Sequence, residues 1–176
     1  MKVLVAYYSL SRNTKKVAEA IFDQIEYEKE ILPINEISNF DGYDIIFAGF
    51  PVWSFQHAQP ADEFFCRHAP KEKKIALFVT HARPYETEDE LEQKKHEAML
   101  QKCRERVKKE NLAGFFHCRG ELSEKEAEPF SKMHSYRNNY NLKPLKAKRN
   151  DSLGHPDADE LEVARIFTRD VMSKVC

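Results

Sequence analysis

Three short runs of almost unbroken apolar residues constrain the fold of this chain more than any other feature. They lie over Lys2–Tyr7 (KVLVAY), Asp44–Phe50 (DIIFAGF) and Lys74–Thr80 (KIALFVT). A strand with one face in water alternates apolar and polar residues, whereas a strand buried on both faces is apolar nearly throughout. These runs therefore predict parallel strands covered on both faces of one sheet.

Segments with helical periodicity alternate with these strands. We expect helices over 13–24, 58–68, 88–110 and 156–175, a weaker strand over 27–34 and a last strand over 113–118. The strand over 27–34 is polar enough for a sheet edge. The alternation predicts an α/β fold: a doubly wound, five-stranded parallel sheet with helices on both faces, in three α/β/α layers.

The length of 176 residues suits one domain with a substantial core. We expect a single domain over 1–176, with an irregular polar excursion at about 121–154. A connection of that length is usually functional or mobile. Its tyrosine-rich part, 133–142, has four open interpretations: a cover over a ligand, the wall of an acceptor pocket, a contact in a homodimer, or a plain surface loop.

Charge and composition exclude several classes of partner. The chain has 28 basic and 29 acidic residues, which argues against bulk electrostatic binding of nucleic acid or anionic membrane. No apolar run is long enough for a membrane span, and the N-terminus does not resemble a signal peptide. The four cysteines are far apart and form no CxxC pair. We therefore expect reduced thiols in a cytoplasmic protein.

The segment Ser9–Thr14 (SLSRNT) stands where the first strand ends and the first helix begins. In an open parallel sheet, ligands bind beyond the carboxyl ends of the strands, and a helix N-terminus attracts anions. The segment supplies three hydroxyls, the amide of Asn13 and the charge of Arg12. A plain helix cap is the alternative, but one such residue suffices for a cap. We favour an anion site.

Other phosphate-binding patterns do not fit this segment. It has neither the GxxxxGK[ST] of a Walker loop nor the GxGxxG of a dinucleotide fingerprint. A low-molecular-weight phosphatase would need a nucleophilic cysteine where Ser9 stands, and a response-regulator receiver would need acidic residues after the first and third strands. What remains is a loop that holds a phosphate without metal and without chemistry on it.

The next two strand ends add groups suited to a planar ring. Pro51, Val52 and Trp53 follow the strand at 44–50, and Thr80, His81, Ala82 and Arg83 follow the strand at 74–80. Trp53 is the single tryptophan and offers an aromatic wall, with a core plug or an interface as the alternative. Arg83 would favour a reduced, anionic ring if it lay near the ring edge; a solvated charge is equally compatible.

The chain resembles the flavodoxin-like family of FMN-binding proteins. The resemblance is carried by SLSRNT with Val17-Ala18 after it, by GFPVW at 49–53 with Pro60 and Phe64-Phe65 behind it, and by GHPD at 154–157. It implies the strand order 2-1-3-4-5 and noncovalent FMN at the carboxyl edge of the sheet. Arg12 stands where electron-transfer flavodoxins usually have glycine, and the third loop has no glycine.

The resemblance also assigns the cofactor-binding residues. Ser9, Ser11, Arg12, Asn13 and Thr14 match the phosphate loop; Pro51, Val52 and Trp53 match the loop beside the isoalloxazine; Thr80, His81, Ala82 and Arg83 occupy the third flavin loop. We predict an FMN-dependent electron carrier that works with a redox partner protein. Two alternatives stay open: an oxidoreductase that uses NAD(P)H and a quinone or another small acceptor, and a flavin-less binding module of the same fold.

Overall fold

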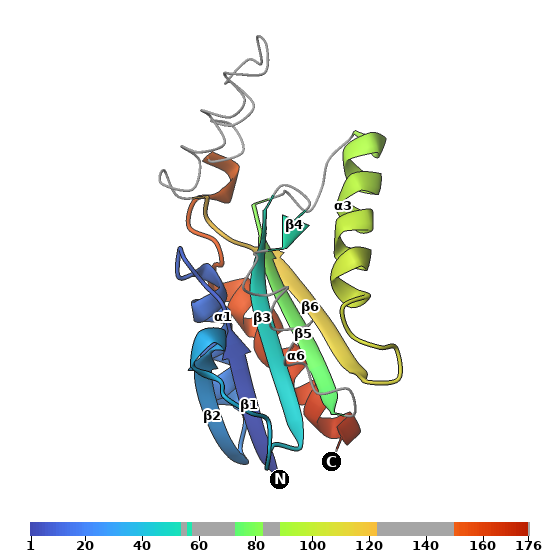
Figure 1. Ribbon diagram of the computed structural model, residues 1–176. Helices are drawn as coiled ribbons and strands as arrows, with labels where there is room; N and C mark the ends of the chain where they lie inside the picture. The colour runs from blue at the N-terminus through green and yellow to red at the C-terminus, as the bar shows by residue number, and fades with distance from the viewer. Residues whose placement is uncertain (54–55, 58–72, 83–88, 123–149, 176) are drawn as a thin grey trace.

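The computed structural model describes residues 1–53, 56–57, 73–82, 89–122 and 150–175; of Trp53, Gln56 and His57 it describes the backbone alone. The elements are β1 (Lys2–Tyr7), α1 (Asn13–Gln24), β2 (Glu28–Pro33), the 3-10 helix η1 (Ile34–Glu36), β3 (Ile45–Trp53), β4 (Gln56–His57), β5 (Lys74–His81), α3 (Glu90–Arg104), β6 (Leu112–Arg119) and α6 (Ala158–Val175). Figure 1 shows the strands side by side, with both chain termini at the end of the sheet where β1 begins.

The five longer strands form one parallel sheet in the order β2-β1-β3-β5-β6. Counted along the chain without the two-residue β4, this is the predicted order 2-1-3-4-5, which is thereby confirmed. The short β4 pairs antiparallel with the end of β3. The polar strand β2 lies at the edge of the described sheet, as its sequence predicts. The predicted binding segments therefore lie at the carboxyl ends of their strands, at one edge of the sheet.

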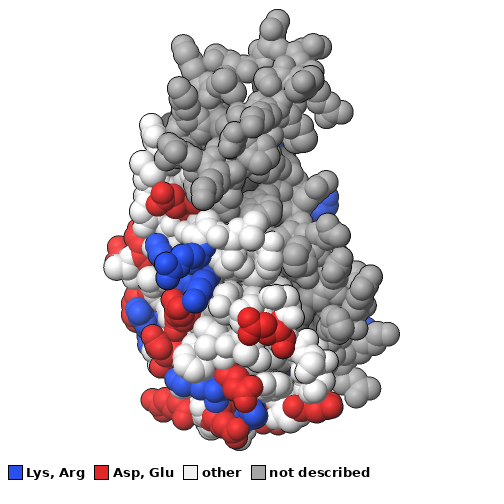
Figure 2. All heavy atoms as spheres, turned by 60° about the vertical axis from the view of Figure 1, so that its left-hand side comes forward, with Lys and Arg blue, Asp and Glu red and all other residues white. Residues whose placement is uncertain are grey.

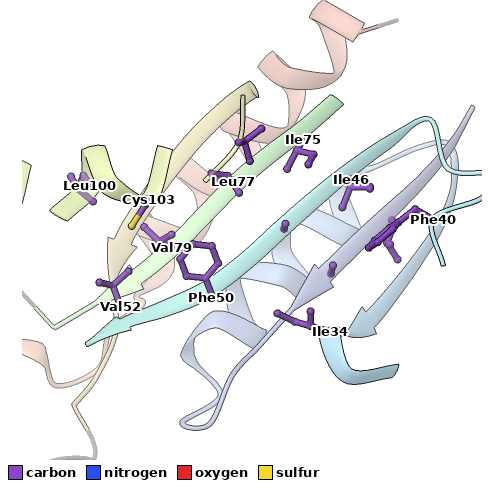
Figure 3. Close-up of a cluster of buried hydrophobic side chains, with 14 of the residues drawn as sticks. Ile34, Phe40, Ile46, Phe50, Val52, Ile75, Leu77, Val79, Leu100 and Cys103 are labelled. Carbon is purple, nitrogen blue, oxygen red and sulfur yellow. The ribbon is translucent and has the colours of Figure 1, made fainter. Parts of the chain in front are cut away.

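Alternate residues of the central strands enter two separate cores. On one face, α1 and α6 cover Val3, Val5, Phe47 and Phe78. On the other face, α3 contributes Met99, Leu100 and Cys103 to a cluster with apolar residues of β1, β3 and β5 (Figure 3). The continuous apolar runs in the sequence are explained by this arrangement, since both faces of the strands are buried.

Two glycines permit this packing. A Cβ on Gly49 of β3 would lie 1.9 Å from the ring of Phe78, its partner on β5. A Cβ on Gly114 of β6 would lie 2.6 Å from Cγ2 of Val171 on α6. Both distances are far below van der Waals contact. The missing side chains therefore let an aromatic ring cross β3 and let α6 approach β6.

Two elements, β3 and α3, differ most from the predictions in their bounds; the other predicted elements that the structure describes differ by at most two residues at either end. The strand expected to end at Phe50 continues to Trp53, because β4 folds back and pairs with its last residues. The helix expected over 88–110 begins only after Asp89, whose side chain caps it, and ends at Arg104. Beyond Arg104 the chain turns toward β6, and the buried Val107 packs into the same core as Cys103. The helix predicted over 58–68 lies outside the described residues.

The predicted excursion at 121–154 leaves and re-enters the fold at one place. Glu121 N donates to His155 O at 2.8 Å, and Leu122 N donates to Ser152 Oγ at 2.9 Å. Residues 123–149, with the tyrosine-rich stretch, lie outside the described residues. Within the described part of the chain, none of the helices combines the length and the apolar character needed to cross a membrane.

Candidate functional site

The loop between β1 and α1 forms the centre of the candidate site. Tyr8 N donates to Gly49 O at 2.9 Å, which fixes the start of the loop to β3. The Oγ atom of Ser9, the next residue, is buried and has no hydrogen-bond partner among the described residues. A buried hydroxyl without a partner costs free energy. Ser9 Oγ therefore marks a position where a ligand that accepts a hydrogen bond would be stabilised.

Arg12 ends this loop in the left-handed conformation, with φ 70° and ψ −3°. Within the described ranges it is the single residue other than glycine with positive φ. Arg12 thus keeps the backbone shape for which a glycine is usual, and adds a charge. Its side chain is exposed and does not cap α1. The first N–H groups of a helix lack intrahelical acceptors, so the start of α1 suits an anion.

Asn13 holds the loop against the end of β6. Its Nδ2 donates to Ser11 Oγ at 3.1 Å and to Glu121 O at 2.8 Å. Gly120 packs so closely on Asn13 that a Cβ on it would lie 3.0 Å from the Asn13 Cβ. Since both N–H groups of the amide are engaged, Asn13 braces the loop. The donor left for a ligand here is the hydroxyl of Ser11, which accepts from Asn13 and keeps its own hydrogen.

Thr80 joins the first loop to the end of β5. Its Oγ1 lies 2.8 Å from Oγ1 of Thr14, and both side chains are buried. The next residue, His81, points to the opposite face of the sheet, because side chains alternate along a strand. There it contacts His96 of α3 and His117 of β6. Of the predicted third-loop residues, the structure therefore brings Thr80, and not His81, to the first loop.

The remaining predicted residues lie at the ends of β3 and β5 or directly after them. Pro51 and Val52 belong to β3 and pair with Thr80 and His81 of β5. Val52 is buried in the core under α3, so its side chain is committed to packing. Ala82 is half-buried at the bend after β5. The side chain of Trp53 and the whole of Arg83 lie outside the described residues.

Three histidines from three elements meet beside the end of β5. His81 Nε2 lies 3.0 Å from His117 Nδ1 and 3.3 Å from His96 Nε2. Burial, and then the nearby charges of His96 and Arg104, lower the pKa of His117 to about 4, so this imidazole is neutral at pH 7. His81 is a residue predicted from the sequence, whereas His96 and His117 were not predicted. Their spacings of 15 and 21 residues match no metal motif, and the topology alone brings them together.

The start of α6 is tied to the end of β6 by Glu160. Its carboxylate accepts from Asp157 N at 2.9 Å and Arg119 N at 3.0 Å, and lies 2.6 Å from His155 Nδ1. The Asp157 side chain accepts from Glu160 N in return, which completes a capping box. Burial, with Glu160 and Asp157 nearby, raises the pKa of the Cys118 thiol far above its ordinary value. Cys118 is therefore no nucleophile.

Charges of both signs are mixed on the surface. On the face shown in Figure 2, Lys and Arg side chains of the described residues are interspersed with Asp and Glu. Lys2, for example, pairs with Glu28 at 3.3 Å and with Glu30 at 2.8 Å. With a net charge of −1, the two signs nearly balance over the whole sequence.

Comparison with known proteins agrees with this geometry. A family model described as a flavodoxin domain matches residues 4–169. The flavodoxin-like domain-containing protein BilS of Clostridioides difficile (strain CD3) is 30% identical over 188 residues, which covers 99% of this chain and 98% of that protein.

Two solved structures share the fold. A flavodoxin from the domain Archaea has a TM-score of 0.59 at 17% identity, with 99% of each chain covered. Oxidised flavodoxin 1 from Bacillus cereus has a TM-score of 0.55 at 16% identity, with 98% of each chain covered. Together with the family model and the curated relative, these matches lead to one conclusion: the chain belongs to the flavodoxin-like family.

Proposed function

We propose that this protein binds FMN noncovalently and transfers electrons through it to or from a redox partner. The observation that carries the proposal is the buried Ser9 Oγ without a described partner, at the end of β1 and ahead of the N-terminus of α1. A polar ligand at that position would satisfy the hydroxyl, and the adjacent helix start favours an anionic one. Membership of the flavodoxin-like family supports FMN as the ligand that supplies a phosphate there.

The first loop would hold the phosphate. Ser9 and Ser11 each have a hydroxyl hydrogen to donate, and the Thr14–Thr80 pair retains one, because only one of its two hydroxyls donates within the pair. Arg12 adds a guanidinium at the loop's surface. Asn13 acts indirectly by fixing the loop to Glu121. The residues present therefore fit a phosphate group.

The ring would lie beyond the ends of β3 and β5. By the family resemblance, Pro51, the backbone of Val52 and Trp53 would flank it on one side, and Ala82 and Arg83 on another. Bound FMN would supply the redox chemistry, and the protein would orient the ring and control its access to water. The described backbone contributes the fixed pairing of Pro51 and Val52 with β5, which sets the spacing of these two walls.

Ligand titration tests the phosphate assignment. We expect FMN fluorescence to be quenched on binding, and riboflavin, which lacks the phosphate, to bind more weakly. Ser9→Ala should weaken FMN binding at least about tenfold, since a hydrogen bond to a charged group contributes about 1.5–3 kcal/mol. The same variant should leave riboflavin affinity nearly unchanged, because riboflavin does not use that donor.

Ser173→Ala is the matched control, because Ser173 is exposed near the end of α6, at the opposite end of the sheet from the first loop. It should bind FMN like the unaltered protein. Equal affinity for FMN and riboflavin would contradict the phosphate assignment, and absence of binding to either would contradict the cofactor. Turnover of NAD(P)H with a quinone by the FMN-loaded protein would replace the partner-protein role with the oxidoreductase role.

A further inference from the structure

The cluster of His81, His96 and His117 lies away from the first loop. The three residues come from the end of β5, from the sheet-facing side of α3 and from β6. Ring centroids are 4.6 Å apart for His81 and His96, and 5.3 Å apart for His81 and His117. One ring nitrogen from each residue lies within 4.8 Å of the other two. Three ring nitrogens thus lie close together.

The hydrogen bonds among the three rings are limited by the single proton or lone pair on His81 Nε2. This atom faces a nitrogen of His117 at 3.0 Å and a nitrogen of His96 at 3.3 Å. A neutral imidazole nitrogen has either one proton or one lone pair. In a hydrogen-bonded arrangement of the rings, His81 Nε2 would therefore have to share its one proton or lone pair between His96 and His117. A cation that accepts one lone pair from each ring would remove this competition at His81 Nε2.

We propose that His81, His96 and His117 form a binding site for a divalent transition-metal ion, with zinc as the representative ligand. With Zn–N bonds of about 2.0–2.1 Å, two nitrogens of a tetrahedral site lie about 3.3 Å apart. The observed separations of 3.0 and 3.3 Å are close to that value. Two of the three nitrogen pairs therefore already have the spacing that such an ion needs, and the third pair lies within 4.8 Å.

The donor set selects the class of metal. Neutral imidazole suits zinc, copper, iron and nickel, whereas magnesium and calcium take oxygen ligands. Three protein nitrogens also leave one position of a tetrahedral site for water or another ligand. Because the ligands come from α3, β5 and β6, a bound ion would tie the exposed helix α3 to the sheet near the end of β5.

A second group, His155, Asp157 and Glu160, has metal-compatible side chains but a different explanation. Its carboxylates accept backbone N–H groups at the start of α6, and Glu160 lies 2.6 Å from the His155 ring. These contacts already explain the placement of all three side chains. The group therefore serves as an internal control in the test of the histidine site.

Cobalt(II) is the probe, because a tetrahedral nitrogen site gives it strong visible absorption. The full chain without an affinity tag should bind one Co²⁺ ion, and Zn²⁺ should displace it. His96→Gln should lower Co²⁺ affinity at least about 100-fold, since losing a group that merely orients a ligand already costs about 10- to 100-fold. Glu97→Gln, an exposed neighbour on the same helix, should bind like the unaltered chain.

Two results would overturn the proposal: equal Co²⁺ affinity of the unaltered chain and His96→Gln, or an equal loss in Glu97→Gln. If His96→Gln fails to fold by circular dichroism, the ring-nitrogen NMR signals of the unaltered chain decide. Addition of one Zn²⁺ equivalent should shift the signals of His81, His96 and His117 together and leave His155 in place. A shift of His155 alone would assign the metal to the α6 group instead. None of these outcomes depends on FMN.

Discussion

At the scale of single residues, Arg12 shows how a glycine position can be filled by a larger residue. Its φ of 70° costs an ordinary residue about 1–2 kcal/mol relative to the right-handed helix. Arg12→Gly removes that strain. It also raises the conformational entropy of the unfolded chain, which lowers stability by about 0.4–1 kcal/mol. We therefore expect the free energy of unfolding in urea to stay the same or rise by up to about 1.6 kcal/mol.

Two variants serve as controls for this prediction. Arg12→Val should lower the free energy of unfolding by about 1–2 kcal/mol, because a β-branched residue tolerates positive φ poorly. Lys16→Gly places glycine at an exposed position inside the same helix, and should cost about 1 kcal/mol. If Arg12→Gly destabilises as much as Lys16→Gly, the left-handed conformation of Arg12 is wrong.

At the scale of elements, the joint between β6 and α6 depends on one carboxylate. Glu160→Ala would remove the acceptor for the backbone N–H groups of Asp157 and Arg119 and open the capping box. Loss of a cap costs about 0.5–2 kcal/mol, and an unsatisfied buried N–H costs about 1–3 kcal/mol. We expect thermal and urea unfolding to show a loss of about 2–4 kcal/mol.

The same helix offers a matched control. Glu162 is exposed and pairs with Arg165 and Arg169, each at 3.2 Å. Surface ion pairs of this kind contribute little, so Glu162→Ala should change the free energy of unfolding by less than about 1 kcal/mol. Equal losses in the two variants would show that Glu160 acts as a general surface charge rather than as a buried acceptor.

At the scale of the whole molecule, stability should be graded across the sheet. Strands β1, β3 and β5 have a partner strand on each side and fully buried side chains, whereas β2 pairs only with β1 among the described strands. We expect amide hydrogen exchange, followed by mass spectrometry, to be slowest in β3 and β5 and measurably faster in β2. Protection of β2 equal to that of β3 would indicate a further contact along that edge.

The sheet could be predicted well from the sequence, because the apolar run of each strand lies within one short segment. Continuous apolar runs such as Lys2–Tyr7 record burial on both faces, and the boundaries of β1 agree with the structure. The site was harder to predict, because it depends on contacts between distant segments. Asn13 bonds to Glu121, 108 residues away, and His81 meets His96 and His117 only through the fold. No periodicity in a single segment carries such information.

The adjacent residues Thr80 and His81 have an evolutionary consequence, because they face opposite sides of one strand. Thr80 reaches Thr14 on the α1 side, and His81 reaches two histidines on the α3 side. Deleting one residue upstream in β5 would exchange these two faces and break both contacts together. Lineages that keep both contacts can therefore lose or gain residues in β5 only in pairs, and alignments of this family should show an even-numbered gap pattern there.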